Sequence, residues 1–253
     1  MCRGKVERAL GILSVLKKKA EERRPFCTAV VPAAGNASRM QGIDKILAPM
    51  GDRPVLAHTL LALNTCPRID EIIVATREDL IVPISNLCKQ YELDKVKTVV
   101  KGGKDRAESI RNGLREASPQ RKLVAIHDGA RPLVSQALLE EVIQTAAKTG
   151  AAAPACPIKD TVKRSADGRI VESTVDRSQL YGVQTPQVFD ADFISAALQY
   201  CADHEIAITD DCSAAEVMGK QVVLTTGSYE NIKITTPVDL VMGEAILKWR
   251  EQH

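Results

Sequence analysis

The residues best suited to chemistry lie in a loop of small residues, Pro32-Ala-Ala-Gly-Asn-Ala-Ser-Arg-Met40, which follows an apolar stretch. Small side chains leave backbone N–H groups accessible, and these groups bind phosphates because their dipoles point at the anion. Arg39 in the loop and Lys45 beyond it add positive charge. The loop matches neither Gly-x4-Gly-Lys-Ser/Thr nor Gly-x-Gly-x-x-Gly, which excludes a P-loop and a dinucleotide-binding turn. An ordinary tight turn is the alternative, but the two cations favour a polyphosphate site.

Two further segments carry candidate residues. Gly102-Gly-Lys-Asp-Arg-Ala-Glu-Ser109 precedes a predicted helix; its glycines allow close approach to a ligand, or it is a plain helix start capped by Asp105. His127-Asp-Gly-Ala-Arg-Pro132 ends a predicted strand. Ligands of open parallel sheets bind at the carboxyl ends of strands, and Mg²⁺ takes few carboxylates beside phosphate oxygens and water. Asp128 is therefore a candidate Mg²⁺ ligand. We interpret His127 as a packing residue, and no Ser/His/Asp or Cys/His spacing predicts a covalent nucleophile.

Apolar and helical stretches alternate along the first 148 residues. The predicted strands are 27–33, 70–76, 96–100 and 122–126, and the predicted helices are 54–66, 79–91, 105–117 and 135–148. This order is typical of βαβ units, and apolar runs without alternation suit strands covered on both faces. We therefore predict an α/β fold: a Rossmann-like open, mostly parallel sheet with helices on both faces.

The segment 158–186 breaks this order. Two polar stretches, 160–164 and 169–173, flank Ser165-Ala-Asp-Gly168, and Asp-Gly is a strong hairpin signal. Neither face of this hairpin is apolar, so we predict a protruding β-hairpin arm that packs on a second subunit. After the arm we expect helices at 190–203 and 210–218, strands at 220–225 and 231–234, and a last helix opened by Pro237 at its first position.

Composition narrows the class of protein. With about 150 residues per domain, the length of 253 residues suggests one large domain with a modest addition. We place the domain at 26–253 and predict an N-terminal amphipathic helical extension at 1–25. The net charge of +2 and the low aromatic content of 3% argue against nucleic-acid binding. The chain lacks the run of roughly 18 apolar residues that a membrane span needs. Seven scattered cysteines without a Cys-x-x-Cys pair, and no secretory signal pattern, predict reduced thiols and a cytoplasmic location.

Taken in order along about residues 28–245, these motifs and several others resemble those of the glycosyltransferase-A-like nucleotidyltransferases. They are most similar to the 2-C-methyl-D-erythritol 4-phosphate cytidylyltransferase family. Each motif is weak alone, but the ordered set is specific. The motifs are 32–40, Lys45, 102–109, 127–132, Asp160-Thr161, Thr174-Val-Asp-Arg177, Gln184-Thr-Pro-Gln187, Thr209-Asp210 and Asn231-Ile-Lys-Ile-Thr235.

The resemblance implies an enzyme that transfers CMP from CTP to 2-C-methyl-D-erythritol 4-phosphate and releases pyrophosphate, in the non-mevalonate isoprenoid pathway. It implies Mg²⁺, or another divalent cation, at Asp128, and Arg39 and Lys45 as the catalytic pair that neutralises the triphosphate. The implied nucleotide contacts are Ala33, Ala34, Gly35, Gly103 and Ser109. The implied acceptor contacts are Arg177, Lys233, Arg131 and Thr209. Because Arg177 lies in the arm, it would serve the neighbouring subunit of a homodimer.

Other functions stay open at this point. The acceptor could be ribitol 5-phosphate or another polyol phosphate, since both acceptors are short phosphorylated polyols. The chain could be a non-catalytic nucleotide-binding module, although the presence of Arg39, Lys45 and Asp128 counts against this. It could also be a membrane-surface protein anchored by residues 5–24. A phosphate monoester is mostly dianionic at neutral pH, so the cytidylyltransferase reaction needs no general base. The four histidines and the lack of a triad fit this requirement.

Overall fold

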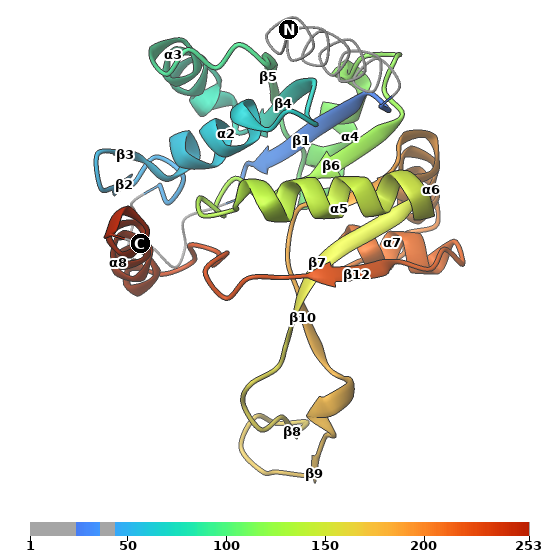
Figure 1. The fold of residues 1–253 in the computed structure, drawn as a ribbon. Coiled ribbons are helices and arrows are strands. Elements are labelled where there is room, and N and C mark those ends of the chain that lie inside the picture. The colour runs from blue at the N-terminus through green and yellow to red at the C-terminus, as the bar shows by residue number, and fades with distance from the viewer. Residues whose placement is uncertain (1–23, 36–43, 253) are drawn as a thin grey trace, which may run out of the picture.

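The computed structural model describes residues 24–35 and 44–252. Its centre is an eight-stranded sheet with the order β10-β7-β11-β6-β1-β4-β5, to which β12 adds by pairing with β7 (Figure 1). Most strand pairs are parallel; β11 runs antiparallel between β6 and β7, and β10 runs antiparallel to β7. The predicted mostly parallel α/β sheet is confirmed. The strands are β1 (Cys27–Ala33), β4 (Glu71–Thr76), β5 (Val96–Lys101), β6 (Leu123–Ile126), β7 (Ala151–Pro157), β10 (Tyr181–Val183), β11 (Gln187–Asp190) and β12 (Val223–Thr226).

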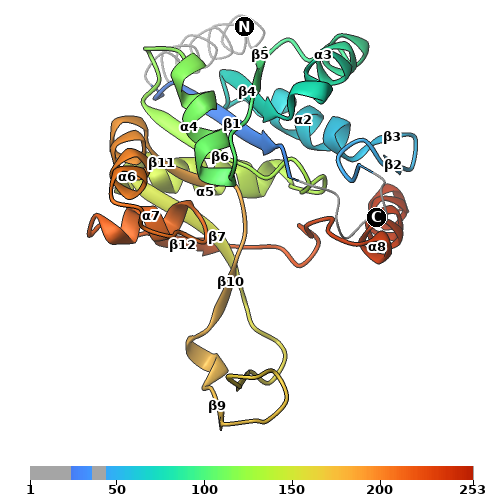
Figure 2. The same cartoon turned by 180° about the vertical axis from the view of Figure 1, so that it is seen from behind.

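Helices cover both faces of the sheet, as the two opposite views show (Figures 1 and 2). On one face lie α2 and α5, and on the other lie α4 and α6, with α7 beside α6. The helix α8 begins at Pro237, as predicted. The helices are α2 (Val55–Thr65), α3 (Ile81–Gln90), α4 (Arg106–Glu116), α5 (Gln136–Thr149), α6 (Ala191–Asp203), α7 (Asp211–Val217) and α8 (Pro237–Gln252).

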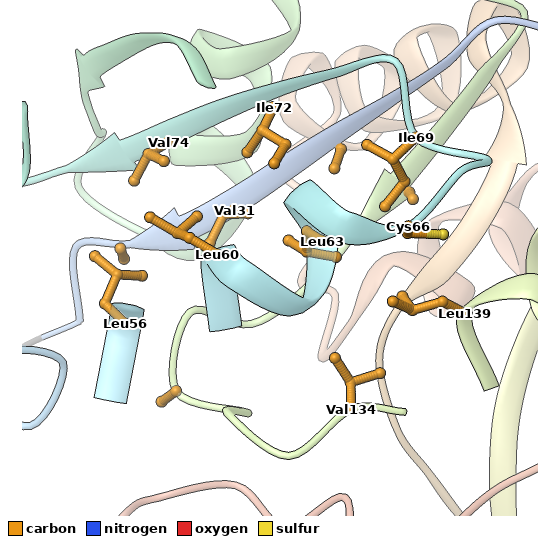
Figure 3. Packing of buried hydrophobic residues seen from close by; sticks show 14 of the residues in the cluster. Val31, Leu56, Leu60, Leu63, Cys66, Ile69, Ile72, Val74, Val134 and Leu139 are labelled. Atoms are coloured by element: carbon orange, nitrogen blue, oxygen red, sulfur yellow. The ribbon is translucent and has the colours of Figure 1, made fainter. Parts of the chain in front are cut away.

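Alternate residues of β1 build two separate cores. Val31 packs with Leu56 of α2 and Val74 of β4 in the core beneath α2 and α5 (Figure 3). Its neighbour Val30 packs with Ile110 of α4 in the core on the opposite face. Successive side chains of a strand point to opposite faces, so a continuous apolar run is what a strand covered on both sides requires. These two cores hold the carboxyl ends of the central strands in place.

The chain between β7 and β10 extends away from the sheet (Figures 1 and 2). Within it, β8 (Lys163–Arg164) pairs antiparallel with β9 (Ser173–Thr174). The predicted strands 160–164 and 169–173 with a turn at 165–168 were therefore wrong in extent. The Asp167 carboxylate accepts hydrogen bonds from the backbone N–H groups of Arg169 and Ile170. This local turn replaces the ladder hydrogen bonds that a tight hairpin would form.

Several strands of the structure were not predicted from the sequence, and one predicted strand is not formed. The strands that were not predicted are β7, whose alanines and prolines are poor strand formers, β10, β11 and the small pair β2 (Pro49–Met50) and β3 (Arg53–Pro54). The strand predicted at 231–234 is absent from the described structure; this segment bonds to the loop after β6 through Ile234 N–H and Ala130 O, 2.8 Å apart. The predicted strand 220–225 became β12, which begins at Val223.

The predicted N-terminal helix lies outside the described residues, except for Arg24, whose guanidinium pairs with the Asp70 carboxylate at 2.7 Å. Among the described helices, none has the length and apolar character needed to cross a bilayer. The six cysteines in the described ranges are buried and carry free thiols, as the sequence predicts for them.

Candidate active site

A pocket of about 210 Å³ opens at the carboxyl ends of β1, β5 and β6. Its position agrees with the rule that open α/β sheets bind ligands at this edge. The predicted site residues that line it are Ala33, Ala34, Gly35, Lys45, Gly103, Ser109, Asp128 and Lys233. Four separate stretches of the sequence thus meet in one pocket, together with Lys233 from the segment before α8.

The loop between β5 and α4 shapes one wall of this pocket. Its Gly103 N–H donates to the Ser109 hydroxyl (3.0 Å), which donates to the Asp105 carbonyl (2.8 Å). A Cβ at Gly102 would lie 2.8 Å from Ser109 Oγ, closer than real Cβ atoms come. Asp105 caps α4 by accepting from Glu108 N–H. The helix-start interpretation of this segment is therefore confirmed, and its glycines serve the packing of the loop on α4. Contacts of Gly103 and Ser109 with a nucleotide stay a prediction.

Asp128 gathers three cationic side chains at the floor of the pocket. Lys233 Nζ lies 2.7 Å from Oδ2 of Asp128, Arg106 Nε lies 3.2 Å from Oδ1, and Arg131 Nε lies 3.9 Å from Oδ2. Burial alone would raise the pKa of Asp128, but the charges of Arg106 and Lys233 outweigh it and hold this pKa well below its usual range. Asp128 is therefore ionised and fixes the cations around it.

Arg106 also pairs with a second carboxylate, which the sequence analysis did not identify. Its Nη2 lies 2.8 Å from Oδ2 of Asp211, a fully buried residue at the start of α7. The two carboxylates raise the pKa of Arg106 despite its burial. The sequence places Arg106 at the start of the helix predicted at 105–117 and Asp210-Asp211 at the start of the helix predicted at 210–218. Nothing in the sequence indicates that these helices meet.

The segment that carries Lys233 is tied to the loop after β6. Arg131 Nη1 donates to the Asn231 carbonyl (2.6 Å), and Asn231 Nδ2 donates to the Thr185 carbonyl (3.0 Å). A second hollow, of about 490 Å³, adjoins this segment and is lined by Arg131, Lys233 and Lys159 among others. Lys233 lines both cavities, so this residue lies at the boundary between them.

His127 is a structural residue, which agrees with its interpretation from the sequence as a packing residue. Its Nε2 lies 3.1 Å from the Arg131 carbonyl, which only accepts, so Nε2 carries the proton. Its Nδ1 then accepts from the Thr185 hydroxyl, which in turn accepts from Asp128 N–H. Burial lowers the pKa of His127 to about 4. The imidazole is neutral at pH 7, and both of its nitrogens are already used.

The remaining predicted residues lie elsewhere. Thr209 lines a cavity of about 720 Å³ between α4 and α6, with Arg106 on the wall that this cavity shares with the first pocket. Arg177 is in the arm, where its Nη1 donates to the Lys159 carbonyl. Arg39 lies outside the described residues. In residues 24–35 and 44–252, no three His, Cys, Asp or Glu side chains are grouped to hold a metal ion.

Comparison with known proteins decides the family. Residues 27–249 match the sequence profile of 2-C-methyl-D-erythritol 4-phosphate cytidylyltransferase, IspD. The chain belongs to the IspD family. Among curated relatives named 2-C-methyl-D-erythritol 4-phosphate cytidylyltransferase, that of Halalkalibacterium halodurans is 41% identical over 227 residues, which span 89% of this chain and 99% of the relative. That of Desulforamulus reducens is 44% identical, over 88% of this chain and 96% of the relative.

Solved IspD structures share the fold. The 4-diphosphocytidyl-2C-methyl-D-erythritol synthase of Anaerococcus prevotii superposes with a TM-score of 0.79 and 34% identity, over 88% of this chain and 96% of that one. The cytidylyltransferase of Thermus thermophilus superposes with a TM-score of 0.73 and 30% identity, over 87% and 98%. The resemblance drawn from the motifs is thus confirmed at the level of the family, and the family match spans every described residue of the pocket.

Proposed function

We propose that this protein transfers CMP from CTP to 2-C-methyl-D-erythritol 4-phosphate, forming 4-diphosphocytidyl-2-C-methyl-D-erythritol and pyrophosphate in the non-mevalonate isoprenoid pathway. Membership of the IspD family, at 40–44% identity to several relatives of that name, carries this proposal. An oxygen of the acceptor phosphate attacks the α-phosphorus of CTP. The new P–O bond forms as the bond to the β-phosphate oxygen breaks, and pyrophosphate leaves.

The nucleotide is assigned to the pocket at the ends of β1, β5 and β6. Ala33, Ala34 and Gly35 lie where small side chains leave the backbone open, and Lys45 lies across from them. Such N–H groups and cations stabilise the charge that builds on the α-phosphate and the leaving pyrophosphate. We assign this role to Lys45 and, outside the described residues, to Arg39. Gly103 and Ser109 are assigned to the nucleoside.

The acceptor phosphate is assigned to the adjoining hollow. Arg131 and Lys233 line it, and Lys233 also borders the nucleotide pocket, so a phosphate bound to Lys233 would lie next to the α-phosphate. Thr209 is assigned to the acceptor from the neighbouring cavity. The dianionic phosphate needs no general base, which agrees with the neutral, doubly hydrogen-bonded His127.

A divalent cation, Mg²⁺ or a similar ion, is part of the proposal. Asp128 supplies one carboxylate at the pocket, and one is enough for an ion that takes its other ligands from phosphates and water. When bound, the ion would draw charge away from the triphosphate. Because each oxygen of Asp128 already contacts a cationic side chain, the ion would share this carboxylate with Arg106 and Lys233.

We further propose a cytoplasmic homodimer in which the arm completes the neighbour's site. Arg177 lines neither pocket of its own chain, and the arm extends away from the sheet (Figure 2). An arm so placed can carry Arg177 to a second subunit. The buried free thiols of the described residues support the proposal of a reducing compartment.

The decisive assay is pyrophosphate release from CTP and Mg²⁺, with methylerythritol 4-phosphate and ribitol 5-phosphate offered separately. We expect release with the first acceptor alone. Release with ribitol 5-phosphate alone would reassign the acceptor, and CTP binding without release would favour a non-catalytic module. Arg39→Ala should abolish release with a modest loss of CTP affinity; unchanged release would exclude Arg39 from the reaction.

The arm is tested by mixing two inactive variants, Arg177→Ala and Lys233→Ala. After the two variants exchange subunits, half of all dimers contain one chain of each variant. If Arg177 acts on the neighbouring subunit, one of the two sites in each such dimer has both Arg177 and Lys233. Activity should then return to about a quarter of the wild-type value. A mixture as inactive as its components would place Arg177 in the site of its own chain.

A further inference from the structure

We propose that Asp211 is a positioning residue: it holds the Arg106 guanidinium against Asp128 and thereby fixes the Lys233 ammonium group between the two substrate pockets. The proposal rests on the function proposed above, since it names the residues that prepare Lys233 for the acceptor phosphate. It concerns a carboxylate that no step of the reaction uses.

Asp211 is a buried carboxyl group with a single cationic partner. Its side chain is inaccessible to water, and its ion-pair partner in the described part of the chain is Arg106, 2.8 Å away. Neither carboxylate oxygen has a well-aligned hydrogen bond in that part of the chain. A buried carboxylate is unfavourable unless it is paired, so this position would be an ordinary place for an apolar residue if it served packing alone.

The backbone of Asp211 is held as firmly as its side chain. Oε1 of Gln187, a buried residue of β11, accepts from the N–H groups of Asp211 and Cys212, both at 3.0 Å. The Gln187 Nε2 group donates to the Asp210 carboxylate (2.7 Å). The first turn of α7 is therefore fastened to the sheet, and Asp211 presents its carboxylate to Arg106 from a fixed point.

The guanidinium then transmits this position to the pocket. Arg106 contacts Asp211 through Nη2 and Asp128 through Nε, and these nitrogens belong to one rigid plane. Fixing one end of the plane fixes the other, so Oδ1 of Asp128 stays bound to Arg106 and Oδ2 stays directed at Lys233. Lysine is a flexible chain ending in a point charge, and it needs such a fixed anion to hold one place.

The main variant is Asp211→Asn, which keeps the shape and the backbone hydrogen bond but removes the charge. Arg106 then loses its buried counter-charge and turns further onto Asp128, which loosens Lys233. We expect the KM for methylerythritol phosphate to rise about tenfold, equivalent to about 1.4 kcal/mol, while the Kd for CTP stays within about twofold. The control is Ala214→Gly, which weakens α7 at a buried position without touching Arg106. It should lower the melting temperature and leave both constants unchanged.

A second measurement does not depend on turnover. We expect an amine-acylating reagent to label Lys233 at least about threefold faster in Asp211→Asn than in wild type and in Ala214→Gly, as measured by peptide mass spectrometry. Arg106→Lys keeps the charge beside Asp211 but cannot bridge two carboxylates, so it should show the same faster labelling even if Asp211→Asn does not fold. Equal labelling in all proteins would overturn the proposal. Wild-type protein that labels as expected but releases no pyrophosphate would instead refute the proposed function.

Discussion

Replacing Thr185 by Val tests the hydrogen-bond chain beneath Asp128. The Thr185 side chain is 4% exposed, and its hydroxyl lies 3.0 Å from both Asp128 N and His127 Nδ1. Valine has nearly the same shape, so it fills the space but leaves the N–H group and the imidazole nitrogen without partners. An unsatisfied buried group costs about 1–3 kcal/mol. We therefore expect the free energy of unfolding to fall by about 2–6 kcal/mol for the two groups together.

The matched control is Thr185→Ser, which keeps the hydroxyl and loses one methyl group. Loss of a buried methyl group costs roughly 1 kcal/mol, so the serine variant should stay close to wild type. The free energies come from urea unfolding by linear extrapolation. If the two variants differ by less than about 1 kcal/mol, the hydroxyl does not bridge these two groups and our assignment of the His127 tautomer is wrong.

Three further predictions concern pH, packing and the cation. The pKa of His127 falls from 6.5 to about 4 on folding, so the unfolded chain binds more protons between these values and stability is lost as the pH drops. Urea unfolding should give about 2 kcal/mol less stability at about pH 5 than at about pH 7, and His127→Gln should remove this slope. A Cβ at Gly113 would lie 2.8 Å from Val30 Cγ1, so Gly113→Ala should cost about 1–3 kcal/mol by overpacking; adding Val30→Ala should recover part of it, and an additive loss would contradict the contact. Asp128→Asn should raise the half-saturating Mg²⁺ concentration for pyrophosphate release about tenfold, and an unchanged concentration with reduced kcat would leave Asp128 as an anchor for Lys233 alone.

The first half of the fold was predictable because its strands and helices are marked by strong local patterns. The run Cys27–Ala33 is β1 with the predicted bounds, and the predicted strand 122–126 encloses β6. In parallel βαβ units each strand is buried on both faces, so its sequence alone identifies it. The second half changes direction: β10 and β11 pair antiparallel, with partners that are not their neighbours in sequence. β7 is recognisable only from that pairing, since Ala and Pro give it no strand pattern.

The motifs located the pocket but not the electrostatic network that organises it. Lys45, Asp128 and Ser109 each stand in a recognisable segment, and the ends of β1, β5 and β6 bring them together. The pairing of Arg106 with Asp211 depends on how α4 and α7 are placed on the same face of the sheet, which no local spacing encodes. Charged residues of two helices show their partnership only once the tertiary structure places them.

The same network explains why an acidic residue stands in a site for two phosphate-bearing substrates. Asp128 and Asp211 together balance two of the three cations Arg106, Arg131 and Lys233, and the surplus positive charge faces the cavities. Without the carboxylates, three like charges would repel one another in a partly buried space and spread apart. With them, the cations stay close enough to act on one phosphate, while the net charge remains positive. Lys45, on the nucleotide side, adds to that charge. Since two multiply charged phosphates exceed what these side chains can neutralise, this charge balance supports the proposal of a divalent cation at Asp128.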